Sequence, residues 1–274
     1  MTVRSFFKAP LKHLRGQRIL DPSVHGAEQV LLVPPFTPEI ASAVGLISPR
    51  LRYRADEQSR VLCQTEANAM SAREYDALSP LFAQVPKPRR VLEVGPGYGR
   101  SVVYFAKKGV WDERAEINLY DATGSDTKYK QKHYATPPQW PDVSSFCGNL
   151  PLLREFLDYN RITNYQILDA AKVPLGQLPG PYDLIYGFFS IGFHWSLEFY
   201  LDDVVPLLGE TGMLICTLNK HFQPFAALRQ FSVRVLRCLE IQKNAAPLTL
   251  LALSKRELPS AGMTLAEGFP GFRA

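Results

Sequence analysis

Short apolar segments that resemble β-strands alternate with helix-like segments along most of this chain. The strand-like segments are rich in β-branched and aromatic residues and end at glycine or polar residues. The helix-like segments repeat apolar residues at three-and-four spacing. Such alternation predicts a mostly parallel sheet with helices on both faces. We expect strands over 90–95, 116–122, 162–170, 182–190, 212–218 and 248–256, and helices over 98–109, 150–160, 196–208 and 224–240.

The chain is long enough for one sizeable core, with 274 residues of which 46% are hydrophobic. Ahead of the alternating segments, proline-bearing stretches bracket a predicted helix over 71–82. Ser71 is placed to cap this helix and Glu74 stands at the capping-box position. The predicted organisation is an accessory segment (1–88), a sheet domain (89–256) and a C-terminal tail (257–274).

Composition favours a cytoplasmic protein. No apolar stretch approaches the ~18 residues of a membrane span, and no secretory signal is present. The net charge of +5 suits an anionic substrate or surface, but its scatter makes nucleic acid an improbable partner. The N-terminus is basic up to Asp21, which predicts weak contact with a membrane surface or an acidic partner, or else a plain solvated terminus. We expect buried free thiols and assign no metal ligand, because the four cysteines are far apart: Cys63, Cys147, Cys216 and Cys238.

Three closely spaced glycines, Gly95, Gly97 and Gly99, follow the first strand in VLEVGPGYGR. Ligands of parallel sheets bind beyond the carboxyl ends of strands, where glycine lets a ligand approach the backbone. A dinucleotide fold would place its third glycine at position 100, which is Arg100 here. This departure disfavours a nicotinamide dehydrogenase. A tight turn without any ligand is the alternative.

Acidic residues accompany three consecutive strands. Glu93 lies inside the first strand, where an acid is normally unwelcome. Asp121 ends the second strand and can accept two ribose hydroxyls, and Asp169 ends the third and can accept from an adenine amino group. Each acid alone could be a strand-end cap. Together they predict one binding site at the carboxyl edge.

The segments VLEVGPGYGR, LYDA, ILDAA and YDLIYGFFS, in that order, resemble the successive motifs of class I S-adenosylmethionine-dependent methyltransferases. The resemblance covers roughly residues 88 to 254. It implies S-adenosylmethionine as cofactor and a Rossmann-like, doubly wound, seven-stranded sheet whose last strand is antiparallel. It also implies site residues: Glu93, Gly95 and Gly97 at the methionine part with Gly99 in the same turn, Asp121 at the ribose, and Asp169 with Ala170 at the adenine.

One stretch departs from that family. Asp121 and Asp169 are 48 positions apart, which is longer than usual there. Residues 123–149 are therefore an insertion or a remodelled helix. Since the stretch is rich in Lys, Tyr, Trp and His, it is also a candidate acceptor-binding loop.

The fourth strand ends in GFFS, without the Asn/Asp-Pro-Pro-aromatic motif typical of base N-methylation or the aspartate of metal-assisted catechol-type enzymes. His194 follows it, and a neutral imidazole there could remove a hydroxyl proton. His221, after the fifth strand, is the rival base, and Asp202 is a carboxylate alternative. A loop histidine bonded to backbone is the plainer interpretation of His194.

The stretch FHWSLEFYL together with GPGYGR is similar to bacterial sugar O-methyltransferase-type proteins. This similarity implies O-methylation of a sugar or glycan hydroxyl, and Arg100 would suit a phosphorylated or acidic glycan, or ribonucleic acid. The alternatives are O-methylation of another small metabolite and a non-catalytic S-adenosylmethionine-binding protein. The sequence names no oligomeric state.

Overall fold

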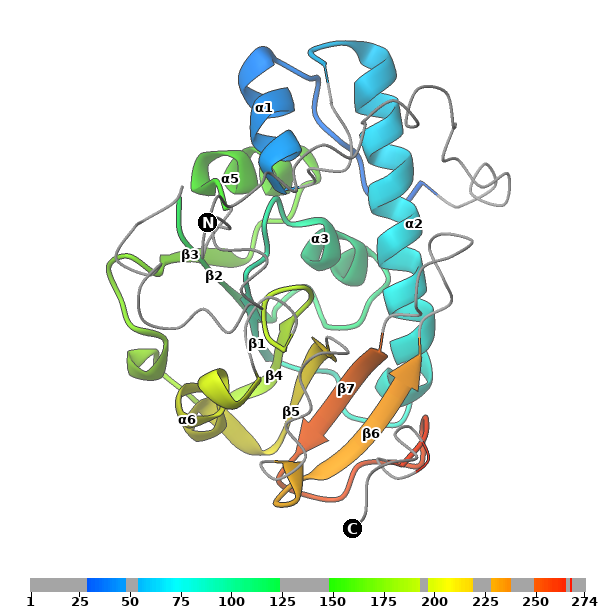
Figure 1. Ribbon diagram of the computed structural model, residues 1–274, viewed down its shortest axis with the longest axis vertical. Coiled ribbons are helices and arrows are strands. Elements are labelled where there is room, and N and C mark those ends of the chain that lie inside the picture. Colours follow the sequence, from blue (N-terminus) through cyan, green and yellow to red (C-terminus); the bar gives the residue numbers. More distant parts are fainter. Residues whose placement is uncertain are drawn as a thin grey trace, which may run out of the picture.

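A seven-stranded sheet forms the centre of the computed structural model (Figure 1). The structure describes residues 29–47, 54–123, 148–192, 197–218, 228–237, 249–264 and 267. The strands are β1 (Arg90–Val94), β2 (Glu116–Asp121), β3 (Tyr165–Asp169), β4 (Tyr182–Gly187), β5 (Leu208–Leu218), β6 (Ser232–Arg237) and β7 (Thr249–Ser254). The helices are α1 (Pro38–Ile47), α2 (Glu57–Phe82), α3 (Arg100–Lys107), α5 (Leu150–Tyr159), α6 (Leu197–Leu207) and the short 3-10 helix η3 (Leu175–Gln177).

The strand order is β3-β2-β1-β4-β5-β7-β6. The first five strands pair in parallel, whereas β7 runs antiparallel to both of its neighbours. The predicted fold class, a doubly wound sheet with an antiparallel last strand, is confirmed. The order reverses between β1 and β4, which is where ligands of such sheets bind.

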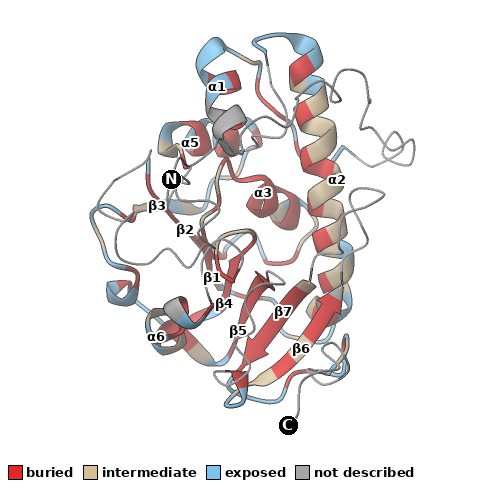
Figure 2. Cartoon of the chain, in the orientation of Figure 1, coloured by how far each residue is buried: buried red, intermediate tan, exposed pale blue. Residues whose placement is uncertain are grey.

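The two faces of the sheet bury separate apolar layers. Most strands at the centre of the molecule are buried (Figure 2). Side chains alternate along each strand, so Val91 and Leu92 on β1 point to opposite faces. Val91 packs in the layer beneath α1, α2, α3 and α5, and Leu92 packs in the layer beneath α6 and η3. This arrangement places the strand ends between two helical layers.

The N-terminal helix α2 is longer than the sequence pattern predicts. It has 26 residues and starts after Asp56, whose side chain accepts from the Ser59 N–H at 2.7 Å. The predicted cap at Ser71 is wrong, because Ser71 and Glu74 lie buried in mid-helix. Within the described residues, no helix, α2 included, combines the length and the apolarity needed to cross a membrane.

The helix predicted over 224–240 is also wrong, because β6 occupies residues 232–237. The sequence SVRVLR alternates buried and partly exposed side chains over most of its length, as a strand pairing with β7 requires. On its outer edge, Val235 exchanges two backbone hydrogen bonds with Met263 at 2.8 and 2.9 Å. The residues after β7 therefore cover part of an edge that would otherwise be open.

Cys63 and Cys216 are buried and take part in no disulfide, as predicted. The other two cysteines, Cys147 and Cys238, and the basic N-terminus over 1–28 lie outside the described residues. Their predicted roles stay predictions.

Candidate cofactor-binding site

The three glycines form a tight turn between β1 and α3. All have positive φ angles, 71° at Gly95, 62° at Gly97 and 88° at Gly99, a region that other residues rarely adopt. The Gly95 N–H donates to the carbonyl of Tyr120 on β2 at 2.8 Å, and the Gly99 N–H donates to that of Pro96 at 2.9 Å. The glycines are thus required by the backbone conformation, before any ligand is considered.

Two of the glycines also meet other parts of the protein. A Cβ atom at Gly95 would lie 2.7 Å from the Cβ of Ser190, just after β4. A Cβ atom at Gly99 would lie 2.8 Å from Cδ1 of Leu153 on α5. Packing within the protein therefore accounts for Gly95 and Gly99.

Asp121 ends β2 directly beside Gly97, the middle glycine of the turn. Its Oδ2 accepts from the Gly97 N–H at 3.1 Å, and its Oδ1 accepts from the Ala122 N–H at 2.8 Å. Burial raises the pKa of this carboxyl to about 7, against the two backbone bonds that lower it. Each carboxylate oxygen keeps acceptor capacity beyond these bonds. Asp121 can therefore anchor the turn and still accept from a hydroxyl.

The chain at Gly148 lies over the Asp121 carboxylate. A Cβ atom at Gly148 would come within 2.5 Å of Asp121 Oδ1 and 2.7 Å of the Ala122 carbonyl oxygen, so only glycine fits. Nearby, the Leu150 N–H donates to Oγ1 of Thr123 at 3.2 Å. The sequence does not single out Gly148, because a lone glycine ahead of a helix cap is common.

The predicted adenine-binding residues stand next to Asp121. Asp169 on β3 is in register with Asp121, and the Ala170 N–H donates to the Asp121 carbonyl at 2.8 Å. Oδ1 of Asp169 accepts from the Ala171 N–H at 3.0 Å, and its Oδ2 lies 3.3 Å from Lys172 Nζ. The fold thus brings the strand-end acids of β2 and β3 to one edge, as parallel pairing predicts.

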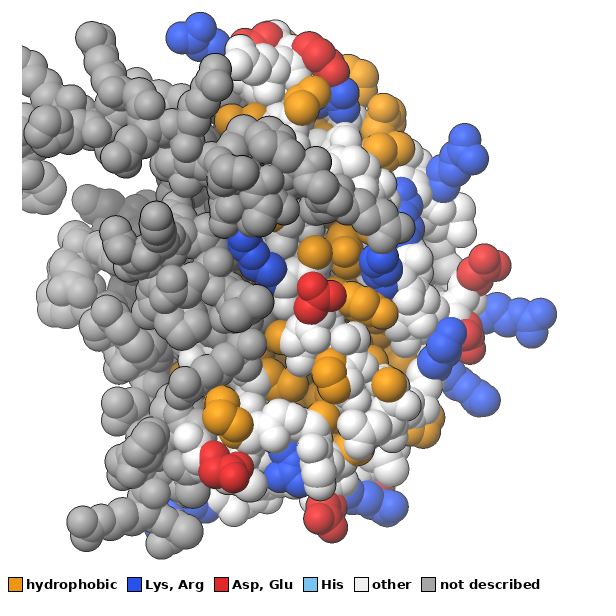
Figure 3. All heavy atoms as spheres, turned by 90° about the vertical axis from the view of Figure 1, so that its right-hand side faces the viewer, with side chains coloured by type: hydrophobic (Ala, Val, Ile, Leu, Met, Phe, Trp, Pro, Cys, Tyr) orange, Lys and Arg blue, Asp and Glu red, His pale blue; other side chains and the backbone are white. Residues whose placement is uncertain are grey.

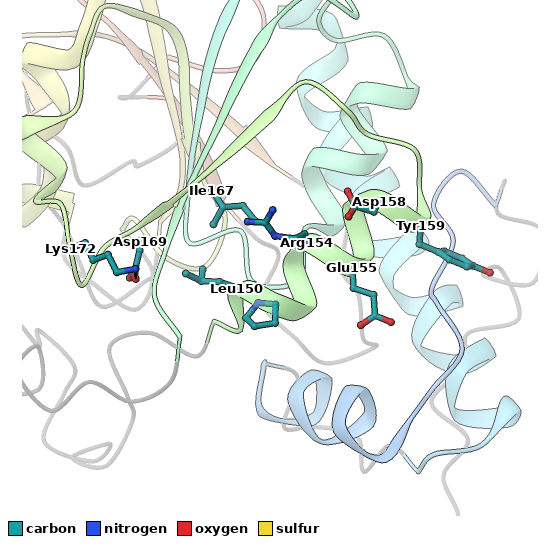
Figure 4. A pocket seen from close by; sticks show the side chains of 9 residues that line it. Leu150, Arg154, Glu155, Asp158, Tyr159, Ile167, Asp169 and Lys172 are labelled. Carbon is teal, nitrogen blue, oxygen red and sulfur yellow. Dashed lines mark ion pairs between the residues drawn. The ribbon is translucent and has the colours of Figure 1, made fainter.

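A hollow of about 780 Å³ opens between α5 and β3, next to this edge (Figure 4). Asp169 and Lys172 lie side by side at one end, with Asp158 and Tyr159 at the other. Asp169 is the predicted site residue that lines the hollow. The other lining residues are Leu150, Pro151, Arg154, Glu155 and Ile167.

Glu93 lies in the core beside the turn and is only 1% exposed. Its Oε1 accepts from the Ser101 hydroxyl, and its Oε2 accepts from the Tyr186 hydroxyl at 2.8 Å. Burial raises the pKa of Glu93 to about 7. Each oxygen keeps acceptor capacity beyond its bond, and the predicted contact of Glu93 with the methionine part stays a prediction. The sequence marks neither Ser101 nor Tyr186, because partners so far apart leave no local pattern.

The chain after β4 carries an unusual backbone conformation. Phe189 has a φ of 63°, which is an outlier for a bulky residue. Such outliers cluster at functional sites. The Ser190 hydroxyl donates to the Val94 carbonyl, which holds this stretch against the end of β1. The sequence does not predict this conformation, because phenylalanine rarely adopts a positive φ and no neighbouring residue indicates one.

Both predicted bases, His194 and His221, lie outside the described residues. The carboxylate alternative, Asp202, is exposed on α6. In the parts of the chain that the structure describes, no three His, Cys, Asp or Glu residues gather as a metal site would require. The catalytic assignments therefore stay predictions.

The interpretation of Arg100 as a contact for an acidic acceptor is wrong. Arg100 is 9% exposed, and its guanidinium pairs with the Glu74 carboxylate at 2.6 Å. A side chain so placed does not reach an acceptor at the surface. The sequence could not show this pairing, because the partner lies on another helix.

No family model matches the sequence. Over 209 residues, the chain is 27% identical to the non-reducing polyketide synthase prhL of Penicillium brasilianum. The match covers 72% of this chain, which spans only 8% of that protein.

Similar solved structures include proteins of several activities. A putative O-methyltransferase from Klebsiella pneumoniae has a TM-score of 0.46 and is 13% identical, with 81% of this chain and 92% of that chain covered. The precorrin-6y C5,15-methyltransferase from Geobacter metallireducens has a TM-score of 0.45 and is 17% identical, with 69% and 89% covered. Spermidine synthase from Thermotoga maritima has a TM-score of 0.44 and is 16% identical, with 68% and 60% covered. These values are low, and the fold given above rests on the strand order of this chain.

Proposed function

We propose that this chain binds S-adenosylmethionine and transfers its methyl group to an oxygen atom. The observation that carries the proposal is the contact between Gly97 and Asp121. A left-handed glycine turn and a buried carboxylate meet where β1 and β2 end, beside the reversal of strand order. A carboxylate in this place can accept hydrogen bonds from ribose hydroxyls, so the residues fit the proposed cofactor.

The charges near the turn support a cationic ligand. Glu93 stands two residues before the turn and Asp121 contacts its middle, while the cation of Arg100 is already paired with Glu74. Excess buried acid repels the two negative charges of a pyrophosphate and attracts a sulfonium or an ammonium group. S-Adenosylmethionine carries both of these cations, whereas a nicotinamide dinucleotide carries the pyrophosphate.

When bound, S-adenosylmethionine supplies a methyl group already activated by a positively charged sulfur. The chain itself then has to hold the cofactor and align the acceptor atom. Asp121 and the glycine turn would hold the ribose side, and Asp169 with Ala170 the adenine side. Proton removal is assigned to His194, with His221 as the rival, on the sequence alone.

For the acceptor, we propose a sugar or glycan hydroxyl, and the support is the similarity of residues 193–201 to sugar O-methyltransferase-type proteins. Part of this stretch lies outside the described residues. Other small-metabolite hydroxyls are chemically equivalent acceptors.

The match to a polyketide synthase favours a second candidate acceptor, a polyketide acyl chain. A carbon between two carbonyl groups loses a proton more readily than a sugar hydroxyl does. Such an acceptor would take the methyl group on carbon and would need a weaker base. It uses the same cofactor site.

Calorimetry on the full chain tests the cofactor first. We expect binding of S-adenosylmethionine and S-adenosylhomocysteine and none of NAD; tight NAD binding, or no binding of the first two, would overturn the proposal. Methyl-labelled S-adenosylmethionine is then incubated with the protein, a panel of glycans, small hydroxylated metabolites and β-ketoacyl thioesters. Label transfer to the thioesters alone would replace the sugar proposal with the second candidate. If the cofactor binds but no acceptor is labelled, the non-catalytic alternative gains support.

A further inference from the structure

Arg100, the residue after the last glycine of the turn, forms a buried bidentate ion pair with Glu74 of α2. Its Nη1 donates to Oε2 and its Nη2 to Oε1, both at 2.6 Å. Nη1 also donates to the Ser71 hydroxyl at 3.1 Å. Ser71 and Glu74 lie one helical turn apart, so one face of α2 holds the guanidinium. The outer side of the molecule near α2 instead carries scattered charges among apolar side chains (Figure 3).

The same guanidinium contacts the end of β4. Its Cζ lies 5.8 Å from the centre of the Phe189 ring, within the range of a cation–π interaction. Phe189 is the residue held at a φ of 63°. The Arg100 side chain therefore joins α2 to the glycine turn and to the stretch after β4, which leads in the sequence to the predicted base His194.

Helix packing alone does not call for this ion pair. Apolar replacements of a buried ion pair are often neutral or stabilising, whereas removal of one partner leaves an uncompensated charge. The helices α2 and α3 already share apolar contacts, including the rings of Tyr75 and Phe105, whose centroids are 6.3 Å apart. What the ion pair adds is a fixed orientation for Arg100.

We propose that Glu74 is a positioning residue for the cofactor and acceptor site, acting through Arg100 on the first turn of α3 and on Phe189. This inference rests on the proposed function, because it takes the glycine turn as the place where S-adenosylmethionine binds. It makes the N-terminal helix α2 a part of the site as well as a cover for the core.

The test measures by calorimetry the affinity of the folded, full-length chain for S-adenosylmethionine, at a temperature well below the melting temperature of each variant. Glu74→Gln keeps the side-chain shape and removes the charge, and it should weaken affinity by ~2- to 30-fold, the range for coupling through packed side chains. Glu57→Gln makes the same change on α2 in a surface pair with Arg60 and should leave affinity unchanged.

A double variant, Glu74→Met with Arg100→Met, separates positioning from a merely structural role. If the pair is only structural, both melting temperature and affinity should match those of the wild type. If the pair positions the site, the melting temperature should recover while affinity stays lowered. Wild-type affinity in folded Glu74→Gln or in the double variant would overturn the inference, and the double variant decides if Glu74→Gln does not fold. Absence of binding by the wild type would instead overturn the proposed function.

Discussion

The pKa of Asp121 makes cofactor binding depend on pH in a way that one substitution should abolish. Burial raises this pKa to about 7 from the ordinary 3.8. If ribose hydroxyls donate to the ionised carboxylate, a proton and the cofactor compete for Asp121. Lowering the pH through 7 then protonates the site and weakens binding. The dissociation constant should rise by up to ~10-fold from pH 8 to pH 6 and by up to ~100-fold from pH 8 to pH 5, since each pH unit is worth ~1.36 kcal/mol. The rise should level off at the affinity of a site with a neutral side chain.

Asp121→Asn keeps the shape of the side chain but is neutral at every pH. At pH 8 it should weaken binding by ~1.5–3 kcal/mol, or ~10- to 150-fold, the range for hydrogen bonds to a charged group. At pH 5 the two proteins should bind alike, because Asp121 is then protonated in the wild type. Titration of the ligand and of Glu93 is common to both proteins, so the ratio of affinities isolates Asp121.

Calorimetry at pH 5, 6, 7 and 8 provides this ratio. Asp112→Asn changes an exposed aspartate in the same way and should leave the whole profile unchanged. A ratio that stays constant from pH 5 to pH 8 would refute the argument that the ionised carboxylate binds the cofactor. Wild-type affinity of folded Asp121→Asn at pH 8 would remove Asp121 from the site.

Three further outcomes are expected. Gly97→Val should abolish cofactor binding. Gly109→Val places the same side chain at a similar φ of 69°, so both variants should lose ~1–2 kcal/mol or more of stability, but Gly109→Val should keep cofactor binding. Equal binding by both variants would mean that Gly97 serves only the turn. Burial raises the pKa of Glu93 to about 7 from 4.5, so the stability from its protonation is full below pH 4.5 and is lost as the pH rises through 7. The free energy of unfolding of the wild type should therefore fall by ~2.5 kcal/mol more than that of Glu93→Gln between pH 5 and pH 8. Urea titrations at each pH measure this difference, and the same dependence of unfolding free energy on pH in both proteins would contradict the argument. Once an acceptor is known, His194→Ala should cut turnover by ~10²–10⁴-fold with little change in cofactor affinity; the same loss in His221→Ala alone would transfer the role of base to His221.

The order of elements could be predicted because it depends on local patterns. Each strand of the parallel part is a short apolar run, and each helix between them has a recognisable period. For the segment 232–237 the sequence does not decide between a helix and a strand, because its apolar residues fit both a helical and an alternating pattern. Pairing with β7, a contact between distant segments, decides for the strand. The start of α2 was missed for a related reason: Ser71 and Glu74 form a good capping box in isolation, but Asp56 caps a longer helix.

The parts of the site that the sequence predicts are those in which the residue type itself indicates the local structure or chemistry. Closely spaced glycines indicate a turn with positive φ angles, and a carboxylate at a strand end indicates a hydrogen-bond acceptor. The structure places one of each, Gly97 and Asp121, beside one another. The partners of Glu93 and Arg100 were not predictable, because Tyr186 and Glu74 come from elements far away in the sequence. Gly148 was missed for the same reason, since its contact with Asp121 exists only in the folded chain.

The buried acids beside the turn carry one further argument about the site. Glu93 and Asp121 both accept two hydrogen bonds, yet burial holds the pKa of each near 7, so each ionises much less readily than an exposed carboxyl. An uncharged amide would be easier to bury and could keep part of these bonds. If the two carboxyls served only to anchor the turn, they would therefore stabilise it less well than uncharged amides. Carboxyls are favoured over amides if a cation binds beside them, because a nearby positive charge stabilises the ionised form and lowers the pKa of each carboxyl. The sulfonium and ammonium groups of the proposed cofactor supply that charge, so folding and binding here depend on the same two side chains.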